Sequence, residues 1–137
     1  MSDYKDLENQ KVNYSVKDKL DRCRGEITHK ETEPSGIPAK TPGAKLDKDK
    51  LRAGQVLPYF PHAIEALATV GDYGLDKYSE AGFLEVSEGV TRYYNAFYRH
   101  LLSYQKGNVI DEDSGLPTIW QVLWNIAAMI ELMERGK

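Results

Sequence analysis

From Leu57 to the end of the chain, apolar residues recur at spacings of three and four, and this periodicity limits the fold more than any other feature. It predicts helices over about 61–78, 87–106 and 117–135. No alternation typical of strands competes with it. We therefore expect an all-α fold, a small bundle of three main helices.

The ends of the expected helices carry recognisable signals. Pro61 suits a first helical turn, and Ser87 is a typical N-cap. Gly107 suits the position just past a helix end. Before the last helix, Asp113 or Ser114 is expected to satisfy free backbone amides, where negative charge is also favourable.

Each expected helix has an apolar stripe that we expect to face the core. Three helices make only a thin core, so we also expect a homo-oligomer to cover the remaining apolar surface. The stripe residues are Ile64, Leu67, Ala68, Gly71, Leu75 and Tyr78; Val90, Tyr94, Phe97, Leu101 and Tyr104; and Ile119, Val122, Leu123, Ile126, Ile130 and Met133.

The first part of the chain, about residues 1–45, is polar and is expected to be largely flexible. Lys30–Gly43 contains three prolines and two glycines, a composition that buries too little apolar surface to offset chain entropy. Within it a short helix is possible, since Val12, Val16, Leu20 and Cys23 have helical spacing. Residues 46–137 are expected to form the helical, functional domain.

Charge and composition exclude several classes of protein. The net charge is −3 with no basic stripe, which argues against binding to duplex nucleic acid. A single cysteine, Cys23, allows neither an intrachain disulfide framework nor an all-cysteine zinc site. No apolar run reaches the ~18 residues of a membrane span. We expect a cytoplasmic protein.

A polar line crosses the otherwise apolar last helix. Thr118, Gln121 and Asn125 are spaced three and then four apart, and Trp120 and Trp124 flank them. Three interpretations are open: an exposed face, a hydrogen-bonded seam that sets the register of two helices, or a wall that contacts a nucleobase or sugar. Amides pair with a base edge and indoles stack on it.

The other two expected helices also carry candidate groups. Arg92, Arg99 and His100 suit phosphate binding and proton transfer, although a lone histidine is more often a packing residue. Glu65 and Asp72 belong to an acidic stripe that either faces solvent or holds a hard cation such as magnesium.

The three acids at 111–113 do not begin a calcium loop of the EF-hand type. A calcium loop that starts at Asp111 needs glycine at its sixth position and glutamate at its twelfth. Those positions hold Leu116 and Val122, so the pattern does not fit.

Three segments in the same order resemble a known family. They are TPGAKLDKDKLR (Thr41–Arg52), LPYFPHAIEALATVGDYGLDKY (Leu57–Tyr78) and RHLLSYQKGNVIDEDSGLPTIWQVLWN (Arg99–Asn125). Together they resemble the N-terminal domain of the dATP/dGTP diphosphohydrolase family, common in bacteriophage genomes and related to the MazG-like all-α nucleotide pyrophosphohydrolases. The resemblance covers about Thr41 to Glu134.

The resemblance implies a purine (deoxy)nucleotide-binding protein in the host cytoplasm. It further implies a magnesium-dependent reaction that cuts a nucleoside triphosphate into a monophosphate and pyrophosphate. With the residues singled out above, the expected catalytic residues are His100 and Asp113. Expected nucleotide contacts are Arg99, Lys77, Tyr78, Ser114, Thr118, Gln121, Trp124 and Asn125. Expected magnesium ligands are Asp111, Glu112, Asp113, Glu65 and Asp72.

The sequence also departs from the family pattern. The pattern has histidines where this chain has Thr118 and Gln121, and an acid where it has Asn108. An alternative is therefore a phage protein that sequesters a nucleotide or a host signalling nucleotide without hydrolysis. A third possibility is an oligomeric structural protein whose polar line only sets helix register.

Overall fold

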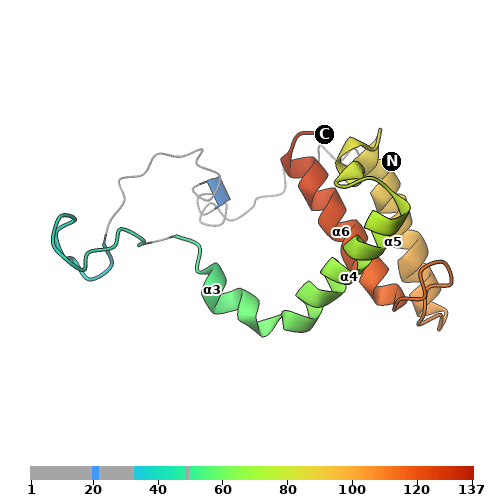
Figure 1. Cartoon of the computed structure of the whole chain (residues 1–137), viewed down its shortest axis with the longest axis horizontal. Helices are drawn as coiled ribbons and strands as arrows, with labels where there is room; N and C mark the ends of the chain where they lie inside the picture. Colours follow the sequence, from blue (N-terminus) through green and yellow to red (C-terminus); the bar gives the residue numbers. More distant parts are fainter. Residues whose placement is uncertain (1–19, 22–32, 49) are drawn as a thin grey trace. The chain divides into compact units, whose positions relative to one another are not determined.

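A computed structural model describes residues 20–21, 33–48 and 50–137, and within these ranges every regular element is a helix (Figure 1). The predicted all-α fold is confirmed. The only extended pairing there is a single antiparallel bridge between Ile110 and Pro117. The chain divides into two compact units, residues 1–56 and 57–137.

Over residues 33–48 and 50–56, the regular element of the first unit is the short helix α3 (Ala53–Val56). The short helix predicted around Val12, Val16 and Cys23 lies outside the described residues, apart from Leu20 and Asp21, which are helical. The expected boundary near residue 45 and the expected flexibility of the preceding segment stay predictions.

The second unit contains the three predicted helices. α4 (Pro61–Lys77), α5 (Gly89–Gln105) and α6 (Thr118–Glu134) have 17 residues each and start and end within two residues of the predicted positions. Short 3-10 helices, η1 (Leu57–Tyr59) and η2 (Gly82–Glu85), precede α4 and α5. Among the described helices, none has both the length and the apolar character needed to cross a membrane.

The expected signals at the end of α5 and the start of α4 are confirmed. Pro61 occupies the first turn of α4. After α5, Gly107 adopts φ +93°, and its N–H donates to the Tyr104 carbonyl at 2.9 Å. The next N–H, of Asn108, donates to the Ser103 carbonyl at 3.1 Å. This pair of bonds is the Schellman ending, which requires a residue that tolerates positive φ.

Two predicted N-caps are wrong. The residue before α5 is Glu88 rather than Ser87, and no side chain caps that helix. α6 likewise has no side-chain cap from Asp113 or Ser114; Pro117 precedes it. Instead, the N–H of Thr118 donates to the Val109 carbonyl at 2.9 Å. A backbone group from the incoming loop thus satisfies an amide that usually needs a side chain.

α6 is the central helix of the second unit. It packs along α5 and also contacts α4 and η2. α5 and α6 run antiparallel, so the start of one lies beside the end of the other (Figure 1). A Cβ on Gly89, at the start of α5, would be 2.7 Å from the Leu132 side chain near the end of α6. A Cβ on Gly71 of α4 would be 2.9 Å from the Trp124 ring. Glycines allow both close approaches.

The face of α6 that is buried in the chain is not the predicted one. The buried positions recur at spacings of three and four. They begin with the three residues of the polar line and continue with apolar residues toward the end of the helix: Thr118, Gln121, Asn125, Ala128 and Leu132, with Val122 beside them. The predicted stripe is wrong for four residues that are 40–55% exposed, namely Ile119, Ile126, Ile130 and Met133. Each of these three polar side chains donates a hydrogen bond to another group of the chain, as described below.

The other two stripes are also partly wrong. In α4 the fully buried residues are Ala66 and Val70, and in α5 only Gly89 is fully buried. The fully buried positions of these two helices thus hold small or medium-sized residues, and several larger residues are exposed. The predicted core residues of these two helices that are exposed are Ile64, Ala68, Leu75, Tyr78, Tyr94 and Tyr104.

We predict that Gly71→Ala and Gly74→Ala will differ in stability. Both glycines lie inside α4, where alanine gains about 1 kcal/mol of helix propensity. A Cβ at Gly74 meets nothing within 4 Å, whereas at Gly71 it collides with the Trp124 ring. Urea unfolding should show Gly74→Ala more stable than the parent, and Gly71→Ala less stable than Gly74→Ala by about 1–3 kcal/mol. Equal stabilisation by both would contradict the packing described.

Candidate functional site

A cavity of about 880 Å³ lies between α4, η2, α5 and α6 in the second unit. Its size is in the range of pockets that hold small organic ligands. Cationic and aromatic side chains dominate its wall, together with two carboxamides. The cations are Lys77, Arg92 and Arg99; the rings include Tyr73, Tyr78, Phe83, Tyr93 and Trp124; and the carboxamides are Gln121 and Asn125.

Trp124 is the largest group on the α6 side of the cavity. Its ring lies 5.5 Å from the ring of Phe83 in an edge-to-face arrangement, an attractive geometry for two aromatic rings. The absence of a side chain at Gly71 leaves the space that the indole occupies. Helix α4, η2 and α6 together therefore hold a flat apolar surface at the cavity wall.

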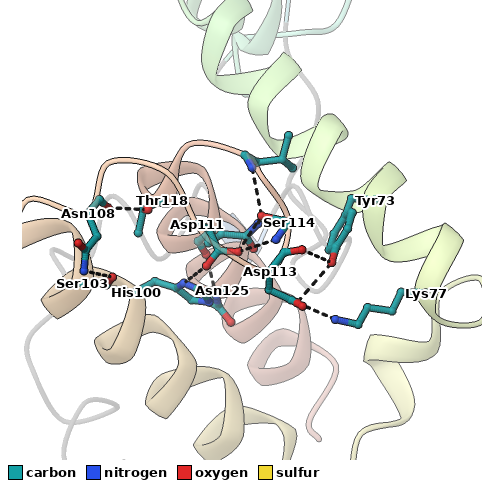
Figure 2. A network of polar contacts seen from close by, with 12 residues as sticks. Tyr73, Lys77, His100, Ser103, Asn108, Asp111, Asp113, Ser114, Thr118 and Asn125 are labelled. Carbon is teal, nitrogen blue, oxygen red and sulfur yellow. Dashed lines mark hydrogen bonds and ion pairs between the residues drawn. The ribbon is translucent and has the colours of Figure 1, made fainter.

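The carboxylate of Asp111 connects the loop between α5 and α6 to helix α5 (Figure 2). One oxygen, Oδ1, is 3.3 Å from Nδ1 of His100 on α5. The other, Oδ2, accepts hydrogen bonds from the backbone N–H of Ser114 at 3.0 Å and from its hydroxyl at 2.8 Å. The Asp111 side chain is only 15% exposed. It thereby stabilises the conformation of the loop and holds the Nδ1 side of the His100 ring at the cavity wall.

The same network continues from the loop into α6. Gln121 donates from Nε2 to the Ser114 hydroxyl at 3.0 Å, and Asn125 donates from Nδ2 to the Gln121 carbonyl at 2.6 Å. Thr118, fully buried, donates its hydroxyl to the Asn108 carbonyl at 2.7 Å. The exposed-face interpretation of the polar line is therefore wrong. These residues form a hydrogen-bonded seam between α6 and the loop.

A second contact holds the loop to α4. Lys77 donates to Asp113 at 2.6 Å, and the Tyr73 hydroxyl is 3.2 Å from the Asp113 carbonyl oxygen (Figure 2). The hydrogen bond to Lys77 lowers the pKa of Asp113, and the same contact raises the pKa of Lys77. The pair is thus formed at neutral pH, and its contribution is lost as pH falls through the lowered carboxyl pKa or rises through the raised lysine pKa. Because both groups are largely exposed, the pair contributes little to stability.

The predicted site residues divide into two groups. Nine of them line the cavity: Asp72, Lys77, Tyr78, Arg99, His100, Asp113, Gln121, Trp124 and Asn125. Five do not. Among these, Asp111, Ser114 and Thr118 support the cavity wall through the hydrogen bonds above, whereas Glu65 and Glu112 are exposed. The individual roles assigned to them stay predictions.

Tyr93 and Phe83 also line the cavity and were not among the predicted site residues. Tyr93 could have been found, since it lies on the face of α5 that carries His100 seven positions later. Burial raises the pKa of its phenol. Phe83 belongs to the short η2, where no helical period marks a face.

The predicted magnesium ligands do not assemble into a cluster of acids. Among the residues described, no group of three or more His, Cys, Asp or Glu side chains could hold a metal ion. Asp111 is engaged with Ser114, and Asp113 with Lys77. Only Asp72 and Asp113 of the predicted ligands line the cavity. The magnesium site stays a prediction.

Comparison with known proteins gives one family. Residues 40–137 match the family model described as dATP/dGTP diphosphohydrolase, N-terminal. The matched segment includes the whole of the second unit and every residue of the cavity wall. Neither the curated proteins nor the solved structures gave a significant match.

We predict that Thr118→Val will lower the free energy of unfolding by about 1–2 kcal/mol, because it leaves the Asn108 carbonyl without its hydroxyl donor. Thr69→Val is the matched control. Thr69 also donates to a carbonyl, that of Glu65 at 2.8 Å, but this carbonyl lies inside α4 and has a backbone donor as well. Chemical denaturation should show a change within about 0.5 kcal/mol for the control. If the two variants lost equal stability, the buried hydroxyl would have no special role.

Proposed function

Because the chain belongs to the dATP/dGTP diphosphohydrolase N-terminal family, we propose that its cavity binds a purine (deoxy)nucleoside triphosphate. One observation carries this proposal: three cations and a set of aromatic rings share the wall of one cavity of about 880 Å³. A nucleotide presents the same division, with anionic phosphates at one end and a flat base at the other.

The cations suit a triphosphate. Arg92 and Arg99 lie seven positions apart on α5, and therefore on one face. Neither guanidinium forms a salt bridge with a carboxylate in the described part of the chain. Guanidinium groups bind phosphate oxygens through two parallel hydrogen bonds. Lys77 adds a third positive charge on the α4 side, although it is shared with Asp113.

We extend the proposal to hydrolysis that yields a nucleoside monophosphate and pyrophosphate. In this reaction a water oxygen forms a bond to the α-phosphorus while the bond to the bridging oxygen of the β-phosphate breaks. His100 suits the role of base, because Asp111 lies against its Nδ1 and leaves Nε2 to take the proton from water. The support for this step is the imidazole–carboxylate pair at the cavity wall.

We include magnesium in the proposal as an ion held by only a few protein ligands. An ion that arrives with a triphosphate needs only one or two protein carboxylates, because phosphate oxygens and water fill its other positions. Asp72 and Asp113 line the cavity and suit that number. When bound, the ion would neutralise phosphate charge.

The alternative is a protein that binds a nucleotide, or a host signalling nucleotide, and does not hydrolyse it. The observation in its favour is that few carboxylates are available to hold a metal ion. Asp113 is already bound to Lys77, and no metal-binding cluster of three acids forms within the described residues. Such a protein requires the cations and the aromatic wall but no metal set.

Incubation of the full chain with dATP, dGTP and cyclic nucleotides, with and without magnesium, followed by chromatography, tests these proposals. Hydrolysis predicts pyrophosphate and a monophosphate that appear only with magnesium and are lost in His100→Asn. A nucleotide recovered intact after denaturation of the protein supports sequestration and contradicts hydrolysis. Arg99→Ala should weaken binding at least tenfold in calorimetry under either proposal. Arg135→Ala, outside the cavity and paired with Glu131, is the control and should bind as the parent does.

We also propose that the chain forms a homo-oligomer through the outward face of α6. Ile119, Ile126, Ile130 and Met133 are 40–55% exposed and lie on one helix at spacings of seven, four and three. A continuous apolar stripe on a small domain is typical of an interface. A second copy presents the same stripe, so a two-fold arrangement pairs it with itself.

Light scattering after size exclusion should give a mass of at least two chains, and the double change Ile126→Lys with Ile130→Lys should give one chain. The helix content of the variant should not change, because both side chains already lie at the surface. Thr91→Lys adds a lysine at an exposed polar position of α5, away from the stripe, and should keep the parent mass. A parent chain that elutes as a monomer at high micromolar concentration would contradict the proposal.

A further inference from the structure

We propose that the carboxamide oxygens of Gln121 and Asn125 accept hydrogen bonds from an amino-bearing edge of the bound base. The proposal rests on nucleotide binding in the cavity and adds what the site recognises in the base. It makes Gln121 and Asn125 the specificity-determining residues and Ser114 a residue that positions one of them.

Both side chains are almost fully buried and both line the cavity. Gln121 is 8% exposed and Asn125 is 4% exposed. Each uses its amide nitrogen as a donor within the protein. Within residues 33–48 and 50–137, neither side-chain oxygen accepts a hydrogen bond from another group of the chain. Buried acceptors without a donor are costly, so their presence at a cavity wall points to a donor on the ligand.

The hydrogen bonds determine which end of each carboxamide carries the oxygen. Ser114 must donate its only hydroxyl proton to Asp111, since an ionised carboxylate can only accept. Its oxygen therefore accepts from Gln121, which requires that the NH₂ end, not the oxygen, faces Ser114. Asn125 is fixed in the same way, because the Gln121 backbone carbonyl can only accept.

This orientation has a chemical consequence for the ligand. Two fixed acceptor oxygens select a group with N–H donors, and adenine and guanine both carry an exocyclic amino group. A base without that group leaves a buried oxygen unpaired, which reduces affinity strongly when a site is built around the missing bond. A nucleotide with the amino group and one without it have the same phosphates and a similar flat ring. A difference in their affinity therefore reports on the hydrogen bonds to the edge of the base.

Calorimetric titration of the full chain with two matched pairs of nucleotides tests the proposal. The pairs are dATP with the triphosphate of purine deoxyriboside, and dGTP with deoxyinosine triphosphate; each second member lacks one amino group. For the natural nucleotide that binds more tightly, removal of the amino group should weaken binding at least tenfold.

Ser114→Ala tests the orientation of Gln121 separately. Without the serine oxygen, the amide of Gln121 is free to turn over, so the affinity ratio within the pair should fall toward one. A merely structural role would weaken both members equally and keep the ratio. Ser103→Ala is the control: Ser103 accepts from Asn108 at 3.2 Å and lies outside the cavity wall, so the ratio should stay as in the parent.

The outcomes separate this inference from the function on which it rests. If dATP or dGTP binds and its partner without the amino group binds equally well, the proposed base recognition is overturned and nucleotide binding stands. If none of the four nucleotides binds, both are overturned. The comparison in the parent chain decides the question even if Ser114→Ala fails to fold.

Discussion

The half-buried carboxylate of Asp111 is the interaction on which the second unit's site depends. It contacts His100 on α5 with one oxygen and accepts two hydrogen bonds from Ser114 with the other. Ser114 in turn accepts from Gln121 on α6. One charged group thus links two helices and the loop that joins them. A charge placed there is satisfied by several donors, which is the condition under which a half-buried carboxylate is tolerated.

The seam explains why α6 has its polar line inside and part of its apolar surface outside. Thr118, Gln121 and Asn125 each donate a hydrogen bond to the loop or within the helix, and these bonds offset part of the cost of burying the three side chains. The isoleucines on the other side, such as Ile126 and Ile130, are then exposed in a single chain. The arrangement of the site and the proposed interface between copies therefore follow from the same helix orientation.

The cavity combines features that belong to different helices. α5 provides the guanidinium groups of Arg92 and Arg99, and α6 provides Trp124 and the two carboxamides. Asp111 lies beside the cavity and holds this wall in place through His100 and Ser114, whereas Asp113 lines the cavity and is tied to Lys77 of α4. Membership of the dATP/dGTP diphosphohydrolase family accords with a nucleotide as the ligand. The chemistry at the phosphates and the recognition of the base are separate questions, since they involve opposite ends of the ligand.

The sequence by itself determined the helical class, the three long helices and the family. Helical periodicity is a local property, and signals such as Pro61 and Gly107 act through the backbone of their own turn. It also marked the polar line of α6, but it could not say which face of that helix is buried, since apolar residues occur on nearly all sides. Only the tertiary structure decided this, because the first N–H of α6, that of Thr118, donates to the loop carbonyl of Val109, and the orientation of the Gln121 amide depends on Ser114. Such partners lie on separate segments, and which of them meet is decided when the helices pack.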